Sequence, residues 1–204
     1  MDKIITISRE YGAGGHSIGQ QVAKELGIPF YDRDILKATV QTSGFDPDMV
    51  EHDQEDVSST NFFFKSICSF ADASFSDTQD AIHDVQKAVI LHFAKEGPCV
   101  ILGRCGDYVL RERENVLRTF VYAPLEARIE FAKTRPDAKD MPDRLWETQL
   151  AKHDRARASY YNYYTENRWG EAKNYDLCLN ATLGREACAD LIVAAARAMQ
   201  EADK

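Results

Sequence analysis

Three glycines within four residues mark the part of the chain whose residue types could bind an anion. Gly12, Gly14 and Gly15 follow a short apolar run and precede a segment with helical spacing. Glycine lets backbone N–H groups come close to a ligand, and the free N–H groups and the dipole at the start of a helix attract negative charge. The stretch favours a site for phosphate groups, and a tight turn without a ligand is the alternative.

The loop lacks the lysine of the common phosphate-binding motif GxxxxGK[ST]. Alignment on helix length places Gly15 at the lysine position and His16 after it. Alignment on the last glycine places His16 at the lysine position and Ser17 at the position of the metal-binding hydroxyl. No lysine lies between Lys3 and Lys24, so in both registers the positive charge must come from other residues.

The segments around this loop predict alternating strands and helices. Ile4, Ile5 and Ile7 are typical of a strand buried on both faces, and Ile18, Val22 and Leu26 repeat on one face of a helix. Further strands are expected over Ile28–Tyr31, Cys99–Leu102, Val116–Ala123 and Tyr175–Asn180, and further helices over Ile35–Thr42, Thr78–Lys95, Asp107–Arg113, Leu125–Thr134, Leu145–Tyr164 and Glu186–Gln200. This order predicts an α/β fold with a five-stranded parallel sheet and helices on both faces.

Composition narrows the class of protein. The chain has 204 residues, of which 44% are hydrophobic and 28% charged, as in a globular domain. No apolar run is long enough to span a membrane and no signal-type segment is present, so we expect a cytoplasmic protein. The net charge of −8 argues against general nucleic-acid binding. Five cysteines without CxxC spacing favour reduced thiols, with Cys99 and Cys178 as buried filler inside strands.

Two unusual segments lie between the second strand and the long helix that follows it. The acidic run Ser43–Asp56 favours a solvated face over a metal site, because its spacing matches no EF-hand. An aromatic cluster comes next, with Phe62, Phe63, Phe64, Phe70 and Phe75. We expect this cluster to pack a small helical lobe or to form the interface of a homo-oligomer.

Three arginines are candidates for binding phosphate. Arg104 follows a buried strand, and ligands of open α/β sheets bind beyond the carboxyl ends of strands. A guanidinium there suits a phosphate, and a structural ion pair is the alternative. Arg155 and Arg157 lie two residues apart, so on one regular helix they diverge by about 200°. They could reach one ligand only across a break in the helix or from the edges of a lid.

Several separate motifs resemble the cytidylate kinase-like family of P-loop nucleoside monophosphate kinases. They are SREYGAGG, AKELGIPFYDRD, VILGRCGDYVLR, VYAPLEARI and DRARASYYNYYT, and together they span almost the whole chain. The resemblance implies a P-loop kinase fold over residues 1–204, a helical insert at 43–76 in the place of the monophosphate-binding lobe, and an arginine-bearing lid at 152–174. It also implies that Asp32 and Arg104 contact the acceptor and that Arg155 and Arg157 close over the phosphates.

The chain departs from the family's cytidine-specific members at one further motif. Leu102 and Cys105 flank Gly103-Arg104 where those members carry aspartates. We therefore expect an ATP- and Mg²⁺-dependent phosphotransferase whose acceptor is a nucleoside monophosphate, CMP first, or another small phosphorylated molecule. The expected ligands of the donor phosphates are Arg9, Gly12, Ala13, Gly14, Gly15, His16 and Ser17, with Ser17 also placing the metal. The alternatives are a nucleotide- or anion-binding regulatory module without turnover, and an assembly protein.

Overall fold

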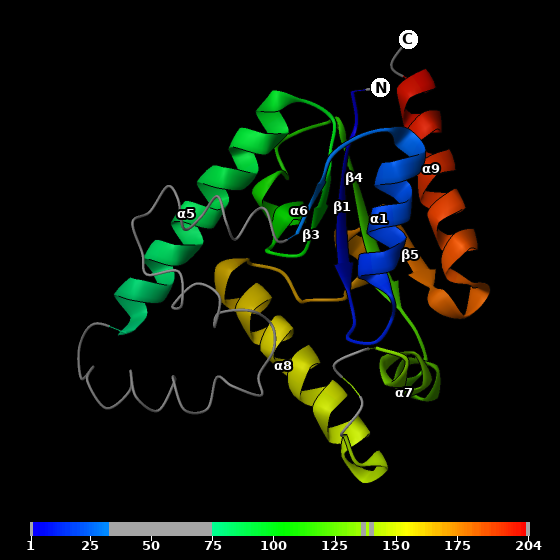
Figure 1. Ribbon diagram of the computed structural model, residues 1–204. Helices are drawn as coiled ribbons and strands as arrows, with labels where there is room; N and C mark the ends of the chain where they lie inside the picture. Colours follow the sequence, from blue (N-terminus) through cyan, green and yellow to red (C-terminus); the bar gives the residue numbers. More distant parts are fainter. Residues whose placement is uncertain (1, 33–74, 136–137, 139–140, 203–204) are drawn as a thin grey trace.

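The computed structural model describes residues 2–32, 75–135, 138 and 141–202, which form a parallel sheet with helices on both faces (Figure 1). The strands are β1 (Ile4–Arg9), β2 (Phe30–Tyr31), β3 (Val100–Leu102), β4 (Val116–Tyr122) and β5 (Leu177–Asn180). The helices are α1 (Gly15–Leu26), α5 (Phe75–Glu96), α6 (Gly106–Val109), α7 (Leu125–Lys133), α8 (Trp146–Tyr164) and α9 (Arg185–Ala202). Short 3₁₀ turns cover η2 (Asp143–Leu145), η3 (Ala172–Asn174) and η4 (Ala181–Leu183). The predicted fold class is confirmed.

The sheet has the strand order β2-β3-β1-β4-β5, with every neighbouring pair parallel. β1 lies between β3 and β4, where Ile7 pairs with Leu102 on one side and with Thr119 on the other. The carboxyl ends of these strands therefore meet at one edge of the sheet, the lower edge in Figure 1. The glycine-rich loop, α7 and α8 lie at this edge.

Two hydrophobic layers cover the sheet. α1 and α9 pack on one face around Ile18, Val22 and Ile192, while α5 and α6 pack on the other around Ile90 and Val109. A third cluster joins α7 to α8 through Ala132, Trp146 and Leu150, with the loop residue Tyr11 against it. This third cluster holds α8 beside the loop.

The expected helix at Asp107–Arg113 is wrong in length, because α6 ends at Val109. The guanidinium of Arg118 on β4 donates to the carbonyls of Leu110, Arg111 and Arg113. These side-chain hydrogen bonds satisfy carbonyls in an irregular turn, so continuing the helix is not needed to pair them.

Cys178 is also not the buried filler that we expected. It lies in β5 but is exposed, whereas Cys99, one residue before β3, is buried. β5 is an edge strand, so one of its faces is less covered than those of the inner strands. The expected helix at Ile35–Thr42 and nearly all of the 43–76 insert, including the acidic run and most of the phenylalanine cluster, lie outside the described residues.

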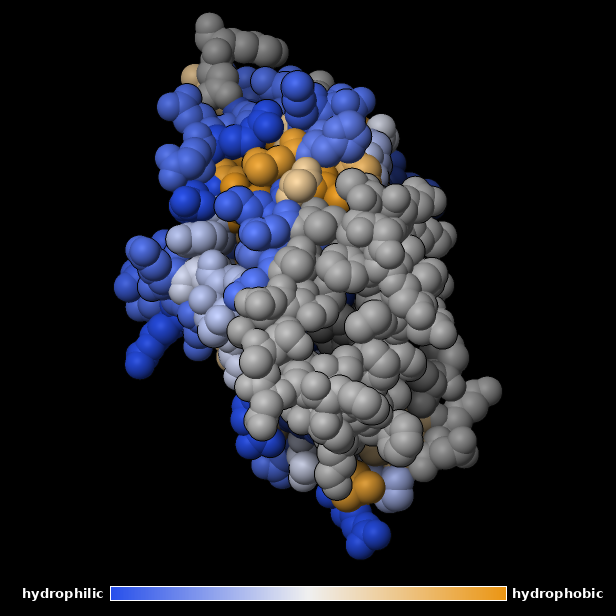
Figure 2. All heavy atoms as spheres, turned by 90° about the vertical axis from the view of Figure 1, so that its left-hand side faces the viewer, coloured by the Kyte–Doolittle hydropathy of each residue, from blue (hydrophilic) through white to orange (hydrophobic). Residues whose placement is uncertain are grey.

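The described surface beside α5 is mainly hydrophilic. Figure 2 shows a small hydrophobic patch in its upper part, framed by hydrophilic side chains. Leu91 of α5 is 42% exposed. Within the described ranges, none of the helices has the length and apolar character needed to cross a membrane. Homo-oligomer formation stays a prediction.

Candidate functional site

The glycine-rich loop ends in a helix start whose backbone N–H groups are free of helical partners. Gly14 caps α1 in the left-handed conformation, with φ at 80°, and Gly15 is the first helical residue. The first N–H groups of a helix have no acceptor within it. Ala13, Gly14 and Gly15 are buried, whereas the side chains of His16 and Ser17 are exposed at the same helix start. The geometry is that of an anion site.

Gly15, at the lysine position of the first alignment, lies under the side chain of Arg9. A Cβ at position 15 would lie 2.7 Å from Arg9 Cγ and 2.8 Å from Arg9 Cβ. The methylene groups of Arg9, the last residue of β1, therefore fill the space that the side chain of a lysine at position 15 would need. Sequence spacing alone could not show this, because the contact depends on how β1 meets α1.

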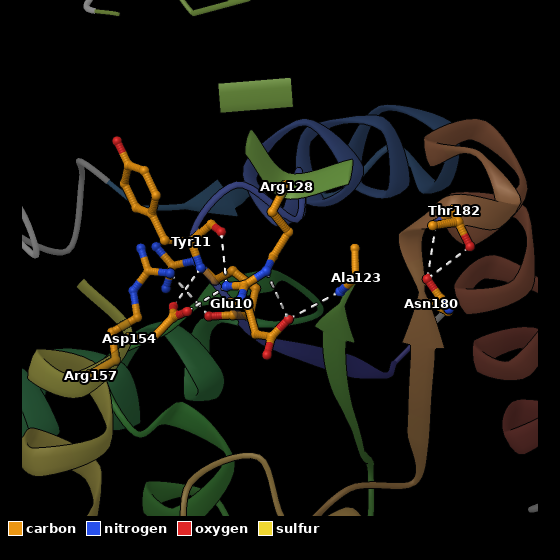
Figure 3. Close-up of polar contacts among 9 residues, drawn as sticks. Glu10, Tyr11, Ala123, Arg128, Asp154, Arg157, Asn180 and Thr182 are labelled. Carbon is orange, nitrogen blue, oxygen red and sulfur yellow. Dashed lines mark hydrogen bonds and ion pairs between the residues drawn. The ribbon is translucent and has the colours of Figure 1, made fainter. Parts of the chain in front are cut away.

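A charged network clamps the beginning of the loop (Figure 3). The Tyr11 backbone N–H donates to Asp154 Oδ1 at 2.7 Å, and Arg128 Nη1 donates to the Tyr11 carbonyl at 3.3 Å and also to Asp154 Oδ2. Arg128 Nε lies 3.4 Å from Glu10 Oε2, which also accepts the N–H of Ala123. Burial raises the pKa of Glu10, although that N–H and Arg128 oppose the shift. Sequence reasoning missed the roles of these side chains.

The structure places Arg157 at the loop and Arg155 away from it. Arg157 Nη1 donates to the carbonyl of Arg9 at 3.1 Å, and its guanidinium carbon lies 5.6 Å from the centre of the Tyr11 ring. Arg155 is exposed, and α8 runs without a break through both positions. The residue that joins Arg157 on this face of the helix is Asp154, three positions earlier.

Further cations surround the loop. The Tyr11 ring stacks on the buried His153 ring, with 4.0 Å between the ring centres. The guanidinium carbon of Arg135 lies 5.4 Å from the centre of the Tyr11 ring. On the other side, a Cβ at Gly14 would lie 2.8 Å from Arg185 Cδ. A chain with a net charge of −8 thus gathers arginines from several elements around one glycine-rich loop. Local positive charge of this kind attracts anions despite the net charge.

Asp32 meets the loop through His16. Its Oδ2 lies 3.4 Å from His16 Nε2, and both side chains are partly exposed. His16 also contacts Phe30 edge to face, at 5.3 Å between ring centres. The carboxylate after β2 therefore lies beside the helix start. Asp34, the second acidic residue after β2, lies outside the described residues.

Arg104 occupies a strained turn after β3. Gly103, Arg104 and Cys105 have φ values of 73°, 55° and 55°. A side chain in the left-handed region costs about 1 kcal/mol or more, and such strain is concentrated at functional sites. The turn is anchored two residues later, where buried Asp107 accepts a 2.6 Å hydrogen bond from Tyr161 of α8. Burial raises the pKa of Asp107, and the hydrogen bond from Tyr161 opposes that shift.

The arrangement joins a helix-start anion site, a strand-end arginine and a helix carrying Arg157 at one sheet edge. Residues 4–183 match the cytidylate kinase-like family. The chain belongs to that family. No curated protein matches it by sequence.

Solved structures place this member of the cytidylate kinase-like family among P-loop kinase folds. An uncharacterized protein from Eubacterium ventriosum ATCC 27560 has a TM-score of 0.72 at 22% identity, covering 96% of this chain and 98% of the other. Shikimate kinase from Bacteroides thetaiotaomicron has a TM-score of 0.57 at 14% identity, covering 98% and 99%. A gluconokinase from Sinorhizobium meliloti 1021 has a TM-score of 0.54 at 16% identity, covering 98% and 94%. At these identities the likeness concerns the fold.

Proposed function

We propose that the protein is an ATP- and Mg²⁺-dependent phosphotransferase acting on a nucleoside monophosphate, with CMP as first candidate, or on another small phosphorylated acceptor. The observation that carries the proposal is the stem of Arg9 lying over Gly15. It brings a permanent positive charge to the helix start from which the lysine is missing. Membership of a kinase-like family and the kinase names of similar structures agree with this proposal.

The chain's own residues supply the positioning and charge that phosphoryl transfer requires. The N–H groups from Gly14 to Ser17 bind donor phosphate oxygens. Arg9 and Arg157 offset the negative charge that develops on the transferred group, and Arg104 holds the acceptor phosphate. That phosphate is already nucleophilic, so no general base is needed, and Asp32 orients groups at the helix start.

The Ser17 hydroxyl would be the ligand that this chain provides for a magnesium ion at the helix start. Its side chain is exposed in the first turn of α1. Among the described residues, no group of three or more His, Cys, Asp or Glu side chains could hold a metal ion. Mg²⁺ in kinases uses one or two protein ligands together with water and substrate phosphates, so a single hydroxyl suffices. The ion would neutralise phosphate charge when bound.

Replacing Arg9 tests the proposal. In a coupled assay with ATP and CMP, we expect Arg9→Gln to lower kcat about 100-fold and Arg9→Lys to retain part of the activity, because charge stabilisation dominates this chemistry. The assay is repeated with the other nucleoside monophosphates as acceptors.

ATP binding without product from any acceptor would instead support the regulatory module. In that case a ligand at 100 times its Kd still adds about 2.7 kcal/mol of stability in a melting experiment.

The two arginines of α8 should differ in their effect on catalysis. We expect Arg157→Ala to lower kcat/KM about 100-fold, because Arg157 reaches the loop. Arg155→Ala should cost much less unless α8 moves during turnover. Arg197→Ala, an exposed change on α9 that removes a weak pair with Glu25, is the control. Equal losses at positions 155 and 157 would show that both arginines close over the phosphates.

A further inference from the structure

A buried side-chain amide on α5 has one half without a hydrogen-bond partner. Gln86 is 1% exposed. Its Oε1 accepts the hydroxyl of Tyr160 on α8 at 3.0 Å. Its Nε2 is buried as well, and no group in the described part of the chain accepts a hydrogen bond from it. An unpaired buried donor costs free energy, so it calls for a physical reason.

The Tyr160 hydroxyl occupies the oxygen end of the amide and leaves Nε2 as the unpaired end. His83 Nδ1 lies 3.0 Å from the Tyr160 hydroxyl. Because that hydroxyl donates its proton to Gln86 Oε1, Nδ1 must donate to the hydroxyl. The His83 ring stacks on Tyr164 at 3.7 Å, and the Tyr164 hydroxyl donates to Asp80. The Gln86 side chain therefore belongs to a polar frame between α5 and α8, and its Nε2 is the end of the amide that this frame leaves without an acceptor.

This frame lies one helical turn from Arg157 on α8. Tyr160 follows Arg157 by three residues, a rise of about 4.5 Å along the helix. The next residue, Tyr161, reaches Asp107 behind the Arg104 turn. In Figure 1, the C-terminal part of α8 runs below the sheet edge toward α5. Gln86 thus contacts the segment of α8 that also carries Arg157 and that reaches Asp107 near the Arg104 turn.

We propose that Gln86 Nε2 donates a hydrogen bond to a neutral oxygen, a carbonyl or a hydroxyl, on the acceptor whose phosphate lies at Arg104 and Arg157. This inference rests on the proposed phosphotransferase function and names the specificity-determining residue of its acceptor. Selection follows from the unpaired donor. A phosphate-accepting molecule with an oxygen beside Gln86 Nε2 pairs with this donor. A molecule with an N–H or a methyl group at the same place leaves the donor unpaired.

The variant Gln86→Met separates ligand recognition from a structural role. Methionine is similar in length and removes the unpaired Nε2 donor, but it also removes the oxygen that accepts from Tyr160, so the two effects oppose each other and the melting temperature should change little. Affinity for the acceptor should fall about tenfold, while affinity for ATP stays unchanged. Gln20→Met, an exposed change on α1, is the control. Lower melting temperature with unchanged acceptor affinity would assign Gln86 to stability alone and overturn the proposal.

Two probes identify the oxygen by calorimetry, with no need for turnover. CMP carries a base carbonyl and ribose hydroxyls, whereas ribose 5-phosphate carries hydroxyls alone. A loss of affinity in Gln86→Met for both probes assigns a hydroxyl, and a loss for CMP alone assigns the carbonyl. Equal affinity of wild type and variant for both, or no binding of either by wild type, overturns the proposal. ATP turnover by wild type with the wider acceptor set judges the phosphotransferase function separately.

Discussion

Introducing the missing lysine, Gly15→Lys, should lower activity at least tenfold rather than improve it. A Cβ at position 15 would come within 2.8 Å of both Arg9 Cβ and Arg9 Cγ. Real side chains do not tolerate such contacts, so one of the two must move. The backbone of Arg9 cannot yield easily, because Arg9 pairs with Val121 in the sheet and its carbonyl accepts from Arg157. The new lysine therefore displaces the arginine that the loop already uses.

A double-mutant cycle separates crowding from charge in this prediction. Gly15→Ala adds the Cβ without a charge and should lose about as much kcat/KM for ATP as Gly15→Lys. Combining Arg9→Gly with Gly15→Lys removes both Arg9 atoms that crowd position 15 and restores one cation, so the double variant should be more active than either single variant. Higher activity of Gly15→Lys than of wild type would show that Arg9 does not supply the lysine's charge.

The glycine-rich unit could be predicted from sequence because its signals are local. Ile4, Ile5 and Ile7 indicate a buried strand, and Gly14 and Gly15 lie where the helix begins. Strand order is a long-range property. The position of β5 at the edge, and with it the exposure of Cys178, could not be read from the pattern of residues in that strand.

The site residues divide in the same way. Helical spacing shows that Arg155 and Arg157 diverge and that Asp154 shares a face with Arg157, but not which face meets the loop. The role of Arg128 could not be predicted from a sequence motif, because that role depends on the packing of α7 against α8. The unpaired Nε2 of Gln86 is likewise visible only once α5 and α8 are placed together.

Removing the centre of the loop clamp, with Arg128→Met, should lower the free energy of unfolding by about 3 kcal/mol. The Arg128 side chain is 12% exposed and contacts two carboxylates whose side chains are 26% and 17% exposed, those of Glu10 and Asp154. Without the Arg128 cation, the negative charges of these two partly buried carboxylates are no longer neutralised by it. Urea unfolding measures the loss. Lys133→Met is the control, since its pair with Asp143 is exposed to solvent and should contribute little to stability.

The loss should be larger at neutral than at acidic pH. Burial raises the pKa of Glu10 above its usual 4.5, and Arg128 lowers it, so the variant's carboxylate should titrate higher still. A carboxyl with a raised pKa in the folded state binds more protons there than in the unfolded chain. The stabilisation that comes from protonated Glu10 is fully present below about pH 4.5 and is lost as the pH rises through the raised pKa. The difference between wild type and Arg128→Met should therefore shrink on acidification. A difference independent of pH would mean that Arg128 acts through packing alone, and the loop would then depend on Asp154 and the Tyr11 N–H for its shape.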